Sequence, residues 1–238
     1  MNLIIVIPAF NEEKIIKESV LRVHHYLKQN ITQSTWQIII ADNKSTDLTS
    51  YIAKSLEQDY QHIKYLFVEE KGKGIAIKKA WQKFDADIYC FMDADLATDL
   101  SSLPPLVDAI NQGGYDMAVG SRFMKGSQVK RSLLRKLFSF GYFVATRIIV
   151  KTKIKDLPCG FKAVNKKVVD HILPQVQNNE WFFDSELVLL AEQKNYKIKE
   201  VPVKWSEPVN RISRVQPLAL SWSYFKNLRQ LKKRLKNR

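Results

Sequence analysis

Cysteine is scarce in this chain, with only Cys90 and Cys159 among 238 residues, and neither takes part in a Cys/His spacing typical of zinc. Two cysteines cannot build the disulfide framework of a small secreted domain, which favours a reducing compartment. Glycine and proline are also few, at 8 each, which excludes fibrous and low-complexity chains. With 45% hydrophobic residues, we expect a folded protein with an apolar core.

Long hydrophobic runs are missing as well. The N-terminal apolar run, 3–7, is too short for a signal peptide and has no basic residues before it. The nearest candidate for a spanning helix, 137–150, contains Arg147 and falls short of the ~20 apolar residues that a bilayer requires. We expect a protein that is soluble or bound to a membrane surface without crossing it.

Acidic residues are absent from two long stretches. Residues 123–155 and 208–238 each contain nine Lys or Arg and no Asp or Glu, and the whole chain has a net charge of +14. The positive charge therefore belongs to two segments of an otherwise mildly acidic chain. Nucleic acid, anionic lipid or a phosphorylated substrate are the partners that such segments favour.

The first half of the chain alternates short apolar runs with helical patterns. The expected strands are 3–7, 36–41, 63–68, 88–92 and 117–119, and helices are expected to begin near Asn11, Ser45, Gly74 and Leu103. In the second half we expect strands at 161–164 and 198–203 and helices at 133–150, 166–173, 184–195 and from about 220 onward. This order predicts an α/β fold with a mostly parallel central sheet and helices on both faces.

Asp93 and Asp95 follow the fourth expected strand. Because alternate residues of a strand point the same way, both carboxylates could face one cation, and hard divalent ions prefer oxygen ligands. An Asp-Ala-Asp triplet such as 93–95 is more often part of a solvated loop. Its place at a strand end, where ligands bind in sheets of this kind, favours a binding site.

Further polar segments follow other expected strands or turns, and each has an ordinary structural explanation. Ser45 or Thr46 would cap a helix, and the acids after Pro8 would begin one. The segment 71–74 offers backbone N–H groups to a phosphate but lacks the P-loop spacing. The cations in 120–122 and 159–162 are taken singly as surface charge, and the aromatics of 181–187 as core.

Taken together in this order, the segments resemble family 2 glycosyltransferases of the GT-A fold, over 3–215. The segments are PAFNEE, ADNKSTD, KGKG, MDADLATD, GSR, CGFK, WFFDSEL, VPVKW and SRV. CGFK followed by WFFDSEL and VPVKW is the part most similar to dolichyl-phosphate glucosyltransferases, polyprenyl-phosphate mannosyltransferases and their bacterial relatives. The resemblance implies a GT-A domain, 1–215, followed by a basic amphipathic helix, 216–238.

The resemblance also implies residue roles. The nucleotide base would meet Pro8, Phe10, Glu12 and Asp42, with Lys73 near the nucleotide. Asp93 and Asp95 would hold Mg²⁺ or Mn²⁺ at the diphosphate. The acceptor phosphate would meet Arg122, Arg131 or Arg135, and Arg214. Asp184 and Glu186 would lie near the transferred sugar, and Lys162 would also bind substrate. Of these, Asp95, Asp184 and Arg122 are the expected catalytic residues.

Three departures from the family pattern concern the nucleotide and the membrane. Phe10 stands where Tyr is common, Asn43-Lys44 replaces an Asp-Gly pair, and the membrane helices of many relatives are absent. The first two leave the donor open between UDP-glucose and GDP-mannose, and the third makes membrane attachment an inference from charge.

The expected reaction is an inverting transfer of a hexose to a polyprenyl or dolichyl phosphate. A phosphate acceptor is largely ionised at pH 7 and needs little help from a base, whereas a saccharide hydroxyl, as in cell-envelope glycan synthesis, would need one, with Asp184 as the candidate. The C-terminal helix could lie on an anionic membrane or pack on the domain. We expect a peripheral protein at the cytoplasmic face of the membrane.

Other protein classes fit less well. A nucleotidylyltransferase would carry a glycine-rich signature near its N-terminus, and residues 8–13 contain no glycine. The charge alone would suit a nucleic-acid binding protein, but no helix-turn-helix, RRM or zinc pattern occurs, so nucleic acid is not the expected partner. A non-catalytic nucleotide-sugar binder stays open as an alternative.

Overall fold

The computed structural model describes residues 1–32, 34–130, 133–207 and 217–236, and the side chains of 133–138 and 217–221 lie outside that description. The strands are β1 (Asn2–Ala9), β2 (Thr35–Asp42), β3 (Ile63–Phe67), β4 (Ile88–Met92), β5 (Met117–Ser121), β6 (Gln128–Lys130), β7 (Phe161–Asn165), β8 (Ile198–Pro202) and β9 (Lys204–Ser206). The α-helices are α1 (Ile16–Asn30), α2 (Thr49–Asp59), α3 (Lys73–Lys83), α4 (Leu103–Asn111), α5 (Leu133–Ile149), α6 (Lys166–His171), α7 (Phe183–Gln193) and α8 (Pro217–Lys236). Two short 3₁₀ helices, η1 (Leu100–Ser102) and η2 (Leu173–Gln175), complete the described elements.

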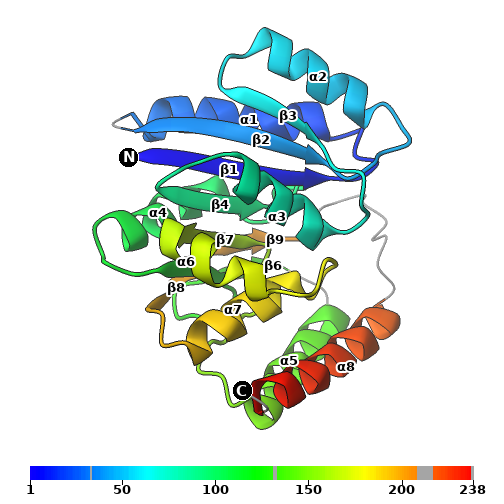
Figure 1. Ribbon diagram of the computed structural model, residues 1–238, viewed down its shortest axis with the longest axis vertical. Coiled ribbons are helices and arrows are strands. Elements are labelled where there is room, and N and C mark those ends of the chain that lie inside the picture. The colour runs from blue at the N-terminus through cyan, green and yellow to red at the C-terminus, as the bar shows by residue number, and fades with distance from the viewer. Residues whose placement is uncertain (33, 131–132, 208–216, 237–238) are drawn as a thin grey trace.

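The described part of the chain forms a seven-stranded sheet in the order β3-β2-β1-β4-β7-β5-β8 (Figure 1). All neighbours pair in parallel except β7, which runs antiparallel between β4 and β5. The mostly parallel α/β sheet that the sequence predicts is therefore confirmed, with one reversed strand inside it.

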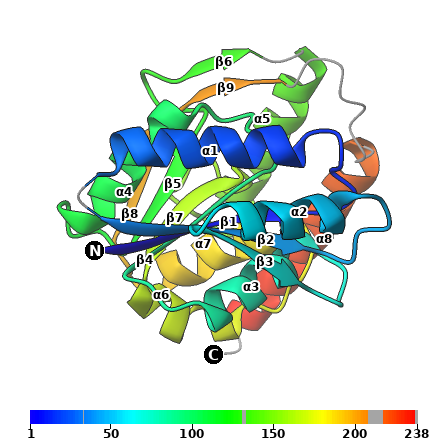
Figure 2. The same ribbon diagram turned by 90° about the horizontal axis from the view of Figure 1, so that it is seen from above.

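Helices cover both faces of this sheet (Figure 2). Alternate residues of β1 explain the two layers: Leu3, Ile5 and Ile7 pack with α1, α2 and α4, whereas Ile4 and Val6 pack with α3, α6, α7 and α8. Each central strand is apolar on both faces because it is buried on both, which is why it appears in the sequence as a continuous run.

Helix α8 packs on the domain through one face. Tyr224, Leu228 and Leu231 are buried in the same core layer as α3 and α7, and α8 lies beside α5 at one end of the molecule (Figure 1). The boundary at 215/216 stays a prediction, because 208–216 lie outside the described residues.

Two expected helix starts are wrong for a common reason. Helix α1 begins at Ile16 instead of Asn11, and α2 begins at Thr49, where neither Ser45 nor Thr46 caps it. The polar residues bind the neighbouring loop instead: the Asn11 N–H donates to Ser45 Oγ at 2.9 Å, and the Thr46 N–H donates to Asn11 Oδ1 at 2.7 Å. These two loops therefore lock to each other beyond the ends of β1 and β2.

Candidate active site

The sequence motifs meet at the carboxyl edge of the sheet. Strands β1, β2, β4 and β5 all end there, and the antiparallel β7 begins there, since Phe161 pairs with Met92. The reversal of β7 therefore brings the segment before it, 156–160, next to Asp93, a neighbourhood that strand order in the sequence does not reveal.

Asp42 is the innermost of the residues expected at the nucleotide base. It is fully buried, and its carboxylate accepts hydrogen bonds from the Ser45 N–H at 3.1 Å, from the Tyr65 hydroxyl at 3.0 Å and from Ser50. A nucleotide base could reach this carboxylate only if one of these donors moved. The contact between Asp42 and a base stays a prediction.

The other residues expected at the base lie in the turn after β1. Phe10 is 37% exposed, with the Lys71 ammonium 6.0 Å from its ring centre. Pro8 pairs with Ala41 in the sheet, and the Glu12 N–H donates to Thr49 Oγ1 at 2.7 Å. An exposed aromatic ring beside a cation is a surface on which a base could stack.

Asn43, which the sequence shows only as a departure from the family pattern, fastens the segment before α3. Its amide nitrogen donates to the Glu70 carbonyl, and its amide oxygen accepts from the Gly72 N–H. Gly72 has φ 136°, and a Cβ there would lie 2.2 Å from the Asn179 carbonyl oxygen. This position therefore requires glycine, and it fixes where Lys73 begins its helix.

Asp93 and Asp95 lie in the turn after β4, so the argument from strand alternation was wrong for them. They nevertheless line one small cavity of about 100 Å³, together with Arg122, Gly160 and Trp205. A Cβ on Gly160 would approach the Asp93 carboxylate to 2.0 Å, so the absence of a side chain there makes room for that carboxylate. That both carboxylates face one cation stays a prediction.

Lys73 joins two acids from distant parts of the chain. Its ammonium lies 2.7 Å from Asp93 Oδ1 and 2.8 Å from Asp184 Oδ2. Burial alone would lower the pKa of Lys73, but the charges of Asp184 and Asp93 outweigh it and raise the pKa above the usual range. Lys73 is therefore a permanent cation at the centre of the site.

Asp184 lies in the first turn of α7 and is shielded from solvent. It is 2% exposed, and its Oδ1 has no hydrogen-bond partner within the described residues. Burial raises the pKa of Asp184, and Lys73 and Lys162 act against that effect. Lys162, fully buried on β7, donates to the Cys159 carbonyl, and burial lowers its pKa. Lys162 is thus an interior side chain, contrary to the surface position that its motif alone suggested.

Arg122 is held by an acid that the sequence reasoning missed. Its Nε and Nη2 each donate to Asp156 at 2.7 Å, and its guanidinium lies 5.7 Å from the Trp205 ring centre. Burial would raise the pKa of the fully buried Asp156, but Arg122 outweighs it and lowers that pKa. The sequence signal was slight: a single acid between a basic stretch and CGFK.

Glu186 does not line the cavity of Asp93 and Asp95 and binds other residues. Its carboxylate accepts from the Asn178 N–H at 2.7 Å and the Gln177 N–H at 3.2 Å, and it pairs with Arg234 of α8. It thus joins α7, the preceding loop and α8, and its contact with a sugar stays a prediction. Arg131, Arg214 and the side chain of Arg135 lie outside the described residues.

The residues present fit a hard divalent cation. Two carboxylates line the cavity, and Mg²⁺ characteristically uses one or two carboxylates together with substrate phosphates and water. The described residues contain no cluster of three or more His, Cys, Asp or Glu able to hold a metal by themselves. A metal here would therefore depend on a phosphate-bearing ligand for further oxygen ligands.

Comparison with known proteins gives consistent results. The family model described as "Glycosyl transferase family 2" matches residues 4–173. Glycosyltransferase AglD of Haloferax volcanii is 30% identical over 202 residues, covering 84% of this chain and 32% of that protein. Dolichyl-phosphate beta-glucosyltransferase of Saccharomyces cerevisiae is 31% identical over 222 residues, covering 85% of this chain and 66% of that protein. The chain thus spans less than two thirds of the length of these relatives.

A solved structure shares the fold. Glucosyl-3-phosphoglycerate synthase from Mycobacterium tuberculosis, in complex with Mn²⁺ and UDP-glucose, superposes with a TM-score of 0.70 at 17% identity, over 98% of this chain and 79% of that one. This confirms the expected GT-A fold. Together with the match over most of the sequence, it shows that the chain belongs to glycosyl transferase family 2.

Proposed function

We propose that this protein transfers a hexose from a nucleoside-diphosphate sugar to a polyprenyl phosphate at an anionic membrane surface. The observation that carries the proposal is the cavity at the carboxyl edge of the sheet, where Asp93, Asp95 and Arg122 meet. It combines oxygen ligands for a metal with a cation for a phosphate. The family and the glucosyl-transferring yeast relative support the same reaction.

The chain's own residues would bind and orient the donor. Asp93 and Asp95 would hold Mg²⁺ or Mn²⁺, which when bound supplies Lewis-acid neutralisation of the leaving diphosphate. The Lys73 ammonium, already 2.7 Å from Asp93, lies where it can meet a diphosphate oxygen at the same place. The loop held by Asn43 keeps that ammonium in position. UDP-glucose and GDP-mannose are the two candidate donors.

The geometry around Asp184 favours a phosphate acceptor over a saccharide hydroxyl. A general base must come within hydrogen-bond reach of the proton that it removes. Asp184 is 2% exposed and bound to Lys73, so it is poorly placed to take a proton from an incoming hydroxyl. A phosphate is already ionised and needs cations that position it, a role for Arg122 and the predicted Arg131, Arg135 and Arg214.

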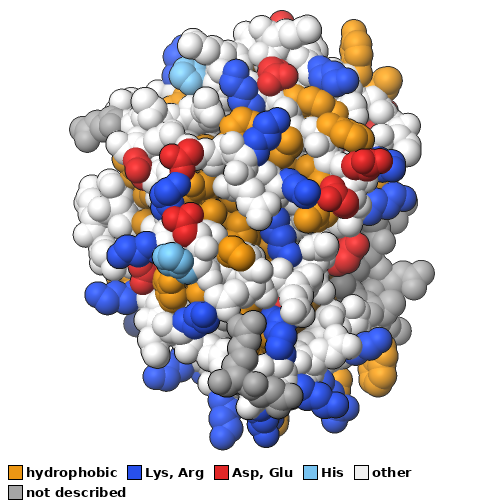
Figure 3. All heavy atoms as spheres, viewed as in Figure 1, with side chains coloured by type: hydrophobic (Ala, Val, Ile, Leu, Met, Phe, Trp, Pro, Cys, Tyr) orange, Lys and Arg blue, Asp and Glu red, His pale blue; other side chains and the backbone are white. Residues whose placement is uncertain are grey.

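The proposed place of action is the membrane surface, on its cytoplasmic face. No helix within the described ranges is both long and apolar enough to cross a bilayer. The two acid-free stretches, 123–155 and 208–238, would attract the protein to anionic lipid. Figure 3 shows Lys and Arg side chains gathered along the lower edge of the molecule, where α5 and α8 lie in Figure 1.

A donor and acceptor panel tests the proposal. Purified protein is incubated with UDP-glucose or GDP-mannose, with Mn²⁺ or EDTA, and with a short polyprenyl phosphate or a saccharide acceptor. We expect a lipid-linked hexose only with metal and the phosphate acceptor. Asp95→Ala should lower the rate by roughly 100-fold or more, because the charge on the leaving diphosphate would lose its counter-ion.

Asp99→Ala is the matched control, since Asp99 accepts from the Ser101 N–H at the start of η1 and does not line the cavity. Equal product from wild type and Asp95→Ala would refute the metal assignment. Product on the saccharide alone would move the acceptor assignment to a hydroxyl. Absence of product from every pair would leave a non-catalytic binding protein.

A further inference from the structure

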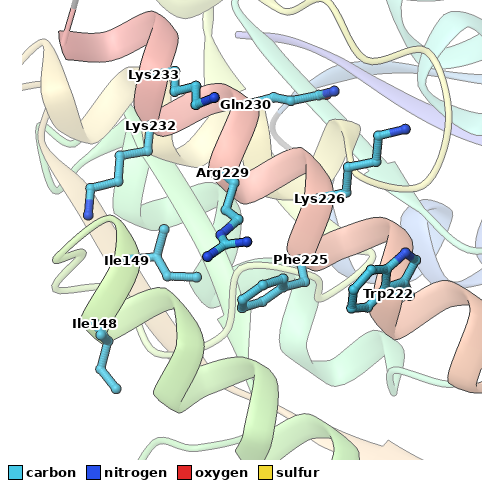
Figure 4. Close-up of a pocket in the computed structure, with 9 residues that line it drawn as sticks. All are labelled: Ile148, Ile149, Trp222, Phe225, Lys226, Arg229, Gln230, Lys232 and Lys233. Carbon is cyan, nitrogen blue, oxygen red and sulfur yellow. The ribbon is translucent and has the colours of Figure 1, made fainter.

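Helices α5 and α8 form a groove with an apolar floor on the outside of the domain. It has a volume of about 630 Å³, and Ile148 and Ile149 of α5 line it opposite Trp222 and Phe225 of α8 (Figure 4). Two of these side chains are largely exposed to solvent, Trp222 at 73% and Ile148 at 69%. Nothing in the site described above uses these residues.

This groove is separate from the apolar face that holds α8 to the domain. Tyr224, Leu228 and Leu231 face the core, and the Tyr224 hydroxyl donates to the Trp181 carbonyl at 2.7 Å. Trp222 and Phe225 form a second apolar stripe on α8, with ring centres 6.4 Å apart. The first apolar face already packs α8 onto the domain, so Trp222 and Phe225 are not required for that packing. An exposed apolar stripe of this kind marks an interaction site.

Cations surround the apolar floor. Lys226, Arg229, Lys232 and Lys233 line the groove together with the apolar side chains, and the Arg229 guanidinium lies 5.0 Å from the centre of the Phe225 ring (Figure 4). Neither α5 nor α8 contains Asp or Glu. A second copy of this chain would bring the same positive charge to the same surface, which opposes self-association through it.

We propose that this groove is where the protein docks on an anionic lipid bilayer, with Trp222, Phe225 and Ile148 entering the interface and the lysines and arginine binding lipid phosphates. Tryptophan and phenylalanine on one side with Lys and Arg around them is the composition of interfacial helices, and tryptophan favours the headgroup region. The proposed docking surface consists of residues from both α5 and α8, and not of α8 alone.

The docking surface is connected to the part of the chain that carries Asp184. The Tyr142 hydroxyl of α5 donates to Ser185 Oγ at 2.9 Å, and Ser185 follows Asp184 at the start of α7. Through this contact α5 is fastened to α7, which carries Asp184, and through the bond from Tyr224 to the Trp181 carbonyl α8 is fastened to the segment just before α7. If the acceptor is lipid-borne, as proposed above, these contacts would link the docked helix pair to the Asp184 region, and this step of the inference rests on the proposed function.

Co-sedimentation with vesicles tests the docking surface. Wild type is compared on phosphatidylcholine vesicles and on vesicles with added phosphatidylglycerol. We expect binding to the anionic vesicles, weakened roughly tenfold by Trp222→Ser, which removes the inserting ring. Arg229→Glu should weaken it roughly thirtyfold, since reversing a charge replaces attraction by repulsion.

The controls carry the same changes elsewhere. Tyr51→Ser removes a ring that is 74% exposed on α2, and Lys17→Glu reverses a charge on α1; neither should change vesicle binding. Trp222→Phe should keep binding but lose part of the quenching of tryptophan fluorescence by brominated lipids. Because Trp222 is exposed, circular dichroism should show an unchanged fold in its variants.

Three results would overturn the docking surface: equal binding by wild type and Trp222→Ser, equal loss with the Tyr51 control, or a dimer in light scattering that Trp222→Ser dissolves. Hexose transfer by wild type to a water-soluble polyprenyl phosphate, measured in parallel, reports the proposed function separately. Vesicle binding without transfer would support the docking surface and contradict the proposed function. Transfer without vesicle binding would support the proposed function and contradict the docking surface.

Discussion

The Lys73 ammonium donates to the Asp184 carboxylate at 2.8 Å, although 111 positions separate the two residues in the chain. The contact joins the first residue of α3 to the first turn of α7. Both side chains are almost completely buried, and Lys73 is the cation that Asp184 contacts directly, whereas Lys73 also contacts Asp93.

Lys73→Met should lower the free energy of unfolding by ~3–5 kcal/mol, because it leaves the buried Asp184 charge without its cation. Urea denaturation at pH 7 measures this loss. Lys71→Met, two residues earlier and exposed, is the control and should change stability by less than ~0.5 kcal/mol. Adding Asp184→Asn to Lys73→Met should recover part of the loss; a further loss of full size would contradict the pairing.

Lys73 also occupies a carboxylate that a metal would need. With the ammonium 2.7 Å from Asp93, a divalent ion that arrives without a nucleotide has to displace a cation already in place. Lys73→Met should therefore bind Mn²⁺ alone more tightly, by roughly tenfold, and bind UDP with Mn²⁺ more weakly. Electron paramagnetic resonance of free Mn²⁺ measures the affinity for the metal alone, and calorimetry measures the affinity for UDP in the presence of Mn²⁺. Weaker binding of Mn²⁺ alone by the variant would contradict this prediction.

Gly160→Ala should disturb the cavity without unfolding the protein. The new Cβ would lie 2.0 Å from Asp93 Oδ2, so the carboxylate has to move from its place. We expect the affinity for UDP with Mn²⁺ to fall by at least roughly tenfold. Gly141→Ala is the control, because a Cβ there meets nothing within 4 Å and the helix α5 should gain up to ~1 kcal/mol. Unchanged UDP binding in Gly160→Ala would separate Asp93 from the nucleotide.

The sequence predicts a strand well where the strand is buried on both faces of the sheet. Leu3 to Ile7 and Ile88 to Met92 are apolar throughout, and both are strands at nearly the expected bounds. The strands β6 and β9 were missed because each has three residues, mostly exposed, with lysine among them. The reversal of β7 was missed because strand direction depends on pairing partners, which a local pattern does not encode.

The candidate site was predictable in its residue types but not in its partnerships. The position of Asp93 after β4 followed from the apolar run before it. The burial of Lys162 did not, since it depends on β7 entering the sheet between β4 and β5, although it follows both of them in the sequence. Asp156 belongs to no recognisable pattern, and only its ion pair with Arg122 reveals its importance.

Asp156→Asn should make stability less dependent on acid pH. Arg122 holds the pKa of Asp156 below its ordinary value of ~3.9 in spite of burial. The carboxylate therefore contributes its full stabilisation above pH ~4 and loses it as the pH falls through the lower folded value. At pH 7 the variant should lose ~3–5 kcal/mol, because the Arg122 charge is left unpaired.

Urea denaturation at pH 7, 4 and 3 should then show the wild-type and Asp156→Asn stabilities converging as the pH falls. Asp170→Asn, at an exposed position on α6, should run parallel to wild type across the same range. Parallel curves for Asp156→Asn would show that Arg122 finds its stabilisation elsewhere.

Asn43→Asp, which restores the acid common in the family, should impair this particular protein. A carboxylate cannot donate to the Glu70 carbonyl as the Asn43 amide does, and it would repel that oxygen. We expect a loss of ~1–3 kcal/mol in stability and weaker UDP binding. Lys44→Gly, the neighbouring return to the family residue, should cost little, because Lys44 has φ 59° and glycine tolerates that conformation. Improved UDP binding in Asn43→Asp would contradict the proposed role of the amide.

The insertion of β7 between β4 and β5 also sets an order for synthesis on the ribosome. Strands β1 to β4 are sheet neighbours that can pair as they emerge, whereas β5 has no link to them until β7 is made. Gly160 reaches Asp93 only at that late stage. A nascent chain arrested before Phe161 would therefore have Asp42 and Asp93 at the ends of paired strands, while the cavity wall that includes Phe161 and Trp205 had yet to form.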